Sequence, residues 1–177
     1  LFCDALDIQY EELDNVSQEV TKTVVAPSVE AQLGKKVKFS DKCALRLAQS
    51  QGTELVKVGR STYVTTNGKK GFVITTSKAY KQGKREKYWF AYRRNPLDDL
   101  KNCEEQFVLY GCKDENTMVL LPVSFIEEHI DGLNSSKDED GTITHWHVVL
   151  FKDEDDTMTW MMSKPDIEEI DISQYMI

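Results

Sequence analysis

The sequence is poor in the residues that build disulfide-linked or metal-stabilised proteins. Its 177 residues include four cysteines and three histidines. No two cysteines form a Cys-x-x-Cys pair, and none lies at zinc-knuckle spacing from a histidine. The four thiols are Cys3, Cys43, Cys103 and Cys112. They are too few and too dispersed for a disulfide framework, so we expect reduced thiols, as in an intracellular protein, and no cofactor.

Long apolar runs and the common signatures of enzymes are also missing. No stretch reaches the roughly 18 to 20 apolar residues that a membrane-spanning helix needs. There is no Gly-x-x-x-x-Gly-Lys-Ser/Thr loop, no Gly-x-Gly-x-x-Gly turn and no Gly-x-Ser-x-Gly elbow. The chain begins at Leu1 without an initiator Met or a secretory leader, so we expect a fragment of a larger protein. These absences favour a binding module over an enzyme, in a cytoplasmic or nucleoid-associated (intracellular) location and without membrane contact.

Charge is sorted along the chain, although the net charge is only −8. Residues 1–30 carry a net charge of −6, residues 31–95 one of +13, and residues 96–177 one of −15. Such sorting indicates an electropositive surface that serves an anionic partner. The alternative is internal, because the basic third could pack beside the acidic thirds so that each neutralises the other.

Short apolar runs separated by turn residues predict an α+β domain. We expect about seven or eight strands and two or three short helices, with a largely antiparallel sheet that is twisted or barrel-like. This single domain would span residues 31–177, with a basic half over 31–95 and an acidic half over 96–177. Residues 1–30 are predicted to form an acidic helical segment and a linker.

Two helices have recognisable ends. The first is predicted over 40–51, with Ser40 as its N-terminal cap and Gly52 as its left-handed stop. Its apolar stripe consists of Cys43, Ala44, Leu47 and Ala48. The second is predicted after Pro122, where Ser124 and Glu127 have the spacing of a capping box.

The clearest turn is Asn67-Gly68, which lies between two alternating runs. Asn and Gly tolerate the positive φ that both central residues of a type I′ turn require. The sequence therefore predicts a two-residue hairpin. Its register would set Tyr63 opposite Phe72.

A basic connector over 77–87 leads into an aromatic strand over 88–93. Alternation along that strand predicts one face with Tyr88, Phe90 and Tyr92 and another with Trp89, Ala91 and Arg93. Lysine and arginine neutralise phosphates, and exposed aromatic rings stack on bases. The predicted nucleic-acid contacts are Lys69, Lys70, Lys78, Tyr80, Lys81, Lys84, Arg85, Lys87, Tyr88, Trp89, Arg93 and Arg94. The alternative is that the aromatic residues form a core strand and the lysines only solvate a loop.

A second candidate site is the pair His145 and His147. Two positions apart on a predicted strand over 143–151, their imidazoles would point the same way, as in strand-borne metal sites. A three-histidine site would also need His129 from the preceding helix. The alternative is that the pair lines the wetter face of its strand.

These observations together predict a nucleic-acid-binding module of a larger intracellular protein, with DNA as the expected ligand. Other domains of the parent protein are further candidate partners. One alternative is a protein-interaction or regulatory domain that docks an acidic partner. Another is a metal-dependent hydrolase that uses His145 and His147.

Overall fold

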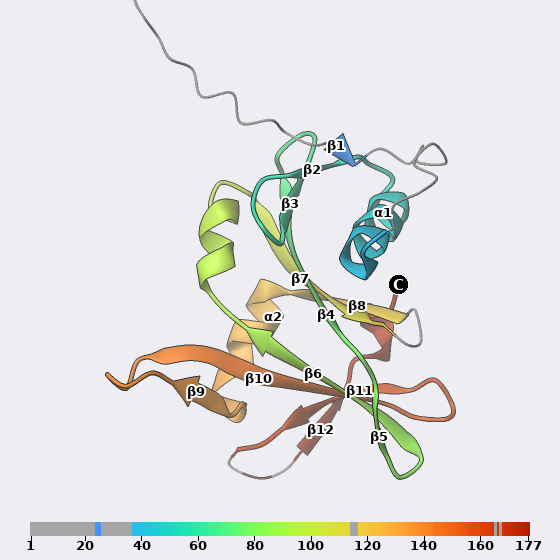
Figure 1. The fold of residues 1–177 in the computed structure, drawn as a ribbon, viewed down its shortest axis with the longest axis vertical. Coiled ribbons are helices and arrows are strands. Elements are labelled where there is room, and N and C mark those ends of the chain that lie inside the picture. Colours follow the sequence, from blue (N-terminus) through green and yellow to red (C-terminus); the bar gives the residue numbers. More distant parts are fainter. Residues whose placement is uncertain (1–23, 26–36, 114–116, 165, 167) are drawn as a thin grey trace, which may run out of the picture.

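The computed structural model describes residues 24–25, 37–113, 117–164, 166 and 168–177. Its elements in chain order are β1 (Val24–Val25), α1 (Phe39–Gln51), β2 (Leu55–Lys57), β3 (Thr62–Thr65), β4 (Lys70–Ser77), β5 (Tyr80–Gln82), β6 (Arg85–Tyr92), η1 (Asn95–Leu100), β7 (Glu105–Cys112), β8 (Thr117–Pro122), α2 (Val123–Glu128), η2 (Ile130–Gly132), β9 (Ser135–Lys137), β10 (Ile143–Lys152), β11 (Met158–Met162), β12 (Glu168–Asp171) and η3 (Ser173–Tyr175). The predicted α+β class is confirmed (Figure 1).

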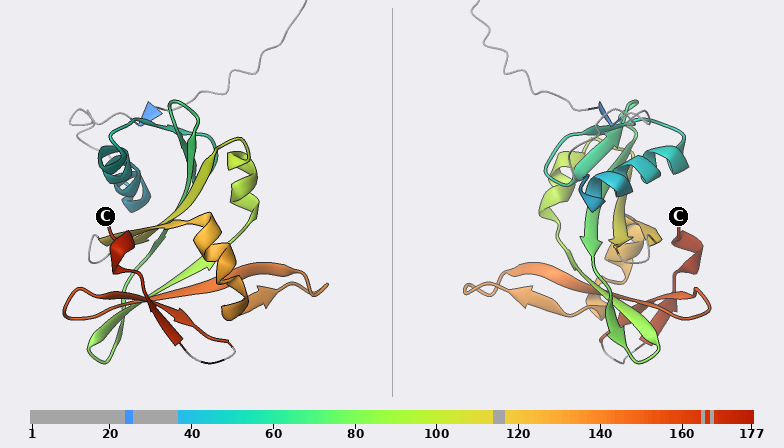
Figure 2. Two further views of the ribbon diagram at one scale, coloured as in Figure 1. Left: turned by 180° about the vertical axis from the view of Figure 1, so that it is seen from behind. Right: turned by 45° about the vertical axis from the view of Figure 1, so that its right-hand side comes forward.

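The strands form two sheets that are not closed into a barrel. Sheet A has the order β1-β2-β3-β4-β7-β8, and all its pairs are antiparallel except β4 with β7. Sheet B has the order β12-β11-β10-β6-β5, and β9 pairs with β10 as a two-stranded arm that projects from the body (Figures 1 and 2). The chain crosses from sheet A to sheet B between β4 and β5.

Strand alternation gives sheet A two buried faces. On β7, Leu109 packs with α1, whereas Val108 and Tyr110 face sheet B. The helix contributes the four residues of its predicted apolar stripe, all of which are buried. The molecule is therefore layered as α1, sheet A and sheet B (Figure 2). One hydrophobic core lies between α1 and sheet A, and the other lies between the two sheets.

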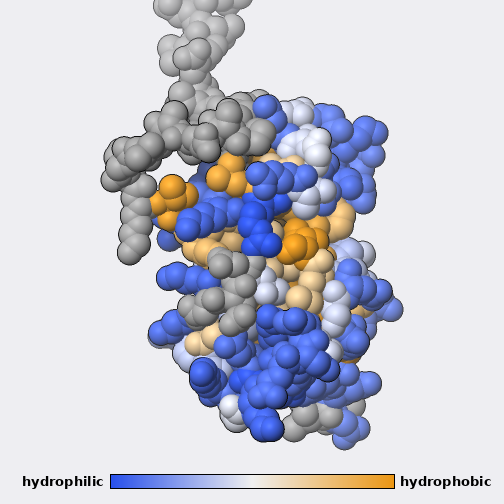
Figure 3. All heavy atoms as spheres, turned by 90° about the vertical axis from the view of Figure 1, so that its right-hand side faces the viewer, coloured by the Kyte–Doolittle hydropathy of each residue, from blue (hydrophilic) through white to orange (hydrophobic). Residues whose placement is uncertain are grey.

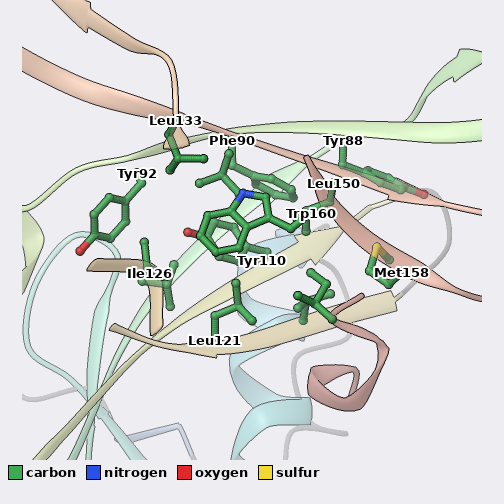
Figure 4. Close-up of a cluster of buried hydrophobic side chains, with 14 of the residues drawn as sticks. Tyr88, Phe90, Tyr92, Tyr110, Leu121, Ile126, Leu133, Leu150, Met158 and Trp160 are labelled. Atoms are coloured by element: carbon green, nitrogen blue, oxygen red, sulfur yellow. The ribbon is translucent and has the colours of Figure 1, made fainter. Parts of the chain in front are cut away.

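The larger core lies between the sheets and is rich in aromatic residues. Trp160 of β11 lies among Phe90 of β6 and Tyr110 of β7 (Figure 4). All three side chains are almost completely buried. Each side chain of this size stabilises the fold by about 1.5–3 kcal/mol through removal of apolar surface from water. This core joins the two sheets and keeps the outer face of sheet B in place.

The local predictions are partly confirmed. Tyr63 pairs with Phe72, as the hairpin register requires. The turn type is wrong, because Asn67 does not adopt a positive φ, and only Gly68 does. The Asn67 side chain instead accepts hydrogen bonds from the Lys69 backbone N–H at 3.0 Å and from the Thr65 hydroxyl at 2.7 Å, which stabilises a longer loop.

Both predicted N-terminal helix caps are wrong, although the helices themselves are present. The first helix starts at Phe39, one residue before Ser40, and Gly52 ends it with a φ of 61° as predicted. Pro122 precedes the second helix without a side-chain cap. Glu127 accepts hydrogen bonds from Tyr92 and Arg94 instead, so tertiary contacts displace the capping box.

The predicted acidic helical segment lies outside the described residues, except that β1 pairs with β2. Among the residues that the structure describes, no helix is long and apolar enough to cross a membrane.

Candidate nucleic-acid interface

The predicted basic connector is a hairpin rather than a flexible link. Strands β5 and β6 pair in antiparallel register, with Tyr80 opposite Lys87 and Gln82 opposite Arg85. Gly83 lies in the turn with a φ of 66°, a value that favours glycine because it has no Cβ. The turn fixes Tyr80 beside Lys87 on one side of the sheet.

The outer face of sheet B turns away from sheet A. Alternation along β6 buries Tyr88, Phe90 and Tyr92 in the core and leaves Trp89 41% exposed. Tyr80, on the edge strand β5, is 51% exposed. We call this surface the open face and define it by Lys78, Tyr80, Lys87, Trp89, Arg93, His145 and His147; Lys81, opposite Glu86, points to the other side of β5.

Cations and aromatic rings alternate on the open face. The Lys78 Nζ atom lies 5.4 Å from the centre of the Tyr80 ring, a cation–π distance. Tyr80, Lys81, Gln82, Lys87 and Trp89 surround a shallow hollow of about 450 Å³. Within the described part of the chain, Lys78, Lys81, Lys87 and Arg93 have no ion-pair partner. Their charge is therefore available to an anionic ligand.

The two histidines lie on the same open face, next to Trp89. Their rings are stacked with centres 5.3 Å apart, and the Trp89 ring lies 5.5 Å from His147 and 6.0 Å from His145. His147 shares a 2.8 Å hydrogen bond with the Ser136 hydroxyl of β9. Partial burial, Arg93 and His147, in that order of size, lower the pKa of His145 below its ordinary value of 6.5.

A three-histidine site is not formed. His129 packs with Phe125 and Trp160 on the core side of sheet B, and its Nδ1 atom lies 2.8 Å from the Phe125 carbonyl oxygen. Across the residues that the structure describes, no group of three or more potential metal ligands comes together. The histidine pair thus joins the aromatic and cationic surface rather than His129.

Two of the predicted phosphate-binding arginines are neutralised inside the molecule. Arg85 donates hydrogen bonds to Glu169 at 2.6 and 2.8 Å and to Asp153 at 3.2 Å. Arg94 pairs with Glu127 and lies 4.6 Å from the ring centre of Trp146. For these two residues, the basic and acidic parts of the chain therefore neutralise each other, which was the alternative to an anionic partner.

The remaining predicted nucleic-acid contacts do not lie on the open face. Lys69 and Lys70 lie at the far end of β4, where they face Glu104 at 3.3 Å and Glu105 at 3.9 Å. Tyr88 is completely buried and hydrogen-bonds Glu86. Lys84 is exposed but shares a shallow surface with the acidic loop that follows β10. We leave these residues out of the open face.

Sequence reasoning did not bring the histidines and the aromatic strand together. They meet because β6 and β10 are antiparallel neighbours, with Trp89 opposite Val149 and Ala91 opposite His147. More than fifty positions separate these strands in the chain, and no local signal specifies their pairing. The one available signal was the shared alternation of the two strands, each with apolar residues on one side and polar residues on the other.

Comparison of the chain with protein-family models, with curated proteins and with solved structures finds no match. The open face is therefore the feature of the chain from which a function is inferred.

Proposed function

We propose that the chain is a nucleic-acid-binding module of a larger intracellular protein, with DNA as the expected ligand, and that it binds through the open face of sheet B. The observation that carries this proposal is the exposure of the Trp89 ring on the open face. A large aromatic ring that is 41% exposed, on the same side of its strand as Lys87 and Arg93, offers a stacking surface and phosphate-binding charges on one face.

The distribution of ion pairs supports this face over other basic surfaces. Lys69, Lys70, Arg85 and Arg94 already face carboxylates of the same chain. A phosphate at any of these residues would have to compete with a bound carboxylate. At Lys78, Lys87 and Arg93 it meets no such competitor among the described residues.

The second candidate is an interaction domain that docks an acidic peptide. The same cations would attract carboxylates, and Trp89 would cover apolar side chains at such an interface. Stacking distinguishes the two ligands, because nucleic acid presents a flat π surface at every residue and an acidic peptide does not.

The test is fluorescence anisotropy of the purified chain with labelled single-stranded DNA, double-stranded DNA and RNA over a salt series. The proposal expects micromolar or tighter binding to at least one form, with a log affinity that falls linearly with log salt. Absence of binding to all three at low salt would contradict the proposal. An acidic peptide of similar length is measured in parallel, and its selective binding would favour the interaction domain.

A further inference from the structure

We infer that the open face takes single-stranded rather than double-stranded nucleic acid, and that the hollow between Tyr80 and Trp89 receives an unpaired base. This inference rests on the proposed function and specifies its ligand. Its basis is the arrangement of two exposed aromatic rings on adjacent strands, with cations between and beside them.

The two rings are held by main-chain geometry rather than by a loose loop. Tyr80 is fixed by the β5–β6 register, opposite Lys87. Trp89 follows Lys87 by two positions on β6, so the two side chains share a face. The Trp89 backbone N–H also donates to the Ser77 hydroxyl at 3.3 Å, which ties β6 to the end of β4. Both stacking surfaces are therefore in place before a ligand arrives.

The hollow between these rings is large enough to take a base. Its volume is about 450 Å³, and its lining combines Tyr80 and Trp89 with Lys81, Gln82 and Lys87. A base that enters it can stack on either ring, while the lysines neutralise the adjoining phosphates and Gln82 offers an amide to the base edge. Bases inside a duplex expose no π surface, so only an unpaired base can use both features.

The acidic surroundings of the open face oppose a duplex. The tip of the β9–β10 arm carries Asp138, Glu139 and Asp140, all exposed. The loop between β10 and β11 carries Asp153, Glu154 and Asp155 beside Lys84. Figure 3 shows that the surface over the β5–β6 and β10–β11 hairpins is hydrophilic, whereas apolar side chains reach the surface nearer α1.

This charge pattern leaves the cations of the open face as a strip between acidic segments at the two ends of β10. A two-stranded ribbon such as β9–β10 could in principle enter a major groove, but its acidic tip would meet the phosphates that line that groove. A single strand can follow the strip and avoid both acidic segments. The described part of sheet B also presents no helix on its open face that could read a groove.

The experiment is a titration of the purified chain with oligothymidine and with a duplex of equal length, followed by tryptophan fluorescence and by anisotropy. Of the three tryptophans, Trp160 is buried and Trp146 is half-buried on the core side, so quenching by a stacked base reports mainly on Trp89. Trp89→Ala should weaken single-strand binding at least about tenfold. Trp89→Phe should keep most of the affinity but lose most of the quenching, and thermal unfolding of both variants checks that the fold is intact.

The outcomes separate the inference from the proposed function. Quenching by oligothymidine, loss of affinity in Trp89→Ala and weaker duplex binding support both. Equal or tighter duplex binding that is unaffected by Trp89→Ala overturns the single-strand inference but leaves nucleic-acid binding standing. Absence of binding to either nucleic acid at low salt overturns both, and selective binding of an acidic peptide would then identify the other ligand class.

Discussion

The Arg85 guanidinium donates a hydrogen bond of 2.6 Å from Nη1 to the Oε1 atom of Glu169, although the two residues are 84 positions apart in the chain. This pair joins the basic third of the sequence to the acidic third. It ties the start of β6 to β12, the far edge of sheet B. The acidic third therefore neutralises selected cations, whereas Lys78, Lys87 and Arg93 on the open face form no ion pair with another described residue.

Loss of the Arg85 network should destabilise the fold without weakening nucleic-acid binding. Arg85→Gln removes charge-assisted bonds to Asp153 and Glu169, and we expect the free energy of unfolding to fall by about 1–2 kcal/mol after allowance for partial solvent exposure. The control is Lys84→Gln at the neighbouring position, which should change the free energy of unfolding by less than about 0.5 kcal/mol. Denaturant unfolding measures both variants. Equal stability of the two would contradict the structural role of Arg85.

The same network has a predictable pH dependence. Hydrogen bonds from Arg85 lower the pKa of Glu169 from its ordinary value of 4.5. A depressed carboxyl pKa stabilises the fold above the unfolded-state value, and that stability disappears as the pH falls through the folded-state value. Wild-type protein should therefore lose more stability than Arg85→Gln as the pH is lowered from about 5.5 to 3.5. Parallel curves for the two proteins in that window would exclude this coupling.

Gly111 should be intolerant of a side chain because α1 packs against it. A Cβ at this position would lie 2.7 Å from the Cys43 sulfur and 3.2 Å from the Phe39 ring, so Gly111→Ala should cost about 1–3 kcal/mol by overpacking. Removal of the sulfur makes room, so Gly111→Ala with Cys43→Ala should be more stable than the sum of the single effects predicts. Urea unfolding of the four proteins in this cycle is the measurement, and strict additivity would contradict the packing argument.

Local features of this fold were predictable, and long-range ones were not. The apolar stripe of α1, its stop at Gly52 and the pairing of Tyr63 with Phe72 follow from residues close in sequence. The parallel pairing of β4 with β7 and the pairing of β6 with β10 do not. Register between distant strands depends on the packing of both cores, which no short window of sequence contains.

The candidate site was only partly predictable for the same reason, because it depends on contacts between residues far apart in the sequence. Alternation placed Trp89 and Tyr88 on opposite faces, but it did not show which face is exposed: both were predicted as nucleic-acid contacts, and Tyr88 is buried. Composition could not distinguish free cations from neutralised ones, because Arg85 and Arg94 find their carboxylates only in the folded chain. Glu127 shows the reverse effect, since its local role as a capping residue lost to tertiary contacts with Tyr92 and Arg94.

The histidine pair should make nucleic-acid binding stronger at mildly acid pH. Partial burial, Arg93 and His147 lower the pKa of His145 in the free protein. A nearby phosphate favours the protonated ring, so binding takes up a proton and affinity rises as the pH falls through the bound-state pKa toward the free-state value. Anisotropy with oligothymidine at about pH 7.5, 6.5 and 5.5, at constant ionic strength, measures the effect.

His145→Ala is the matched variant for this pH series. It should bind with nearly the same affinity as wild type at the highest pH and should lack most of the gain at the lowest. A full pH response in His145→Ala would show that another group takes up the proton. A response of opposite sign in the wild-type protein would place the bound phosphates away from the histidines.

The measurement that tests the location of the interface most directly compares the salt dependence of single-strand binding in two double variants. Lys78→Ala with Lys87→Ala removes two positive charges from the open face. Lys69→Ala with Lys70→Ala removes the same charge from the opposite end of β4, an eight-residue strand about 23 Å long. We predict that the first variant reduces the slope of log affinity against log salt by about 1.4, or about 0.7 per lost phosphate contact, and that the second leaves it at the wild-type value. An unchanged slope in the first variant with a reduced slope in the second would contradict the account and move the interface to the β3–β4 hairpin.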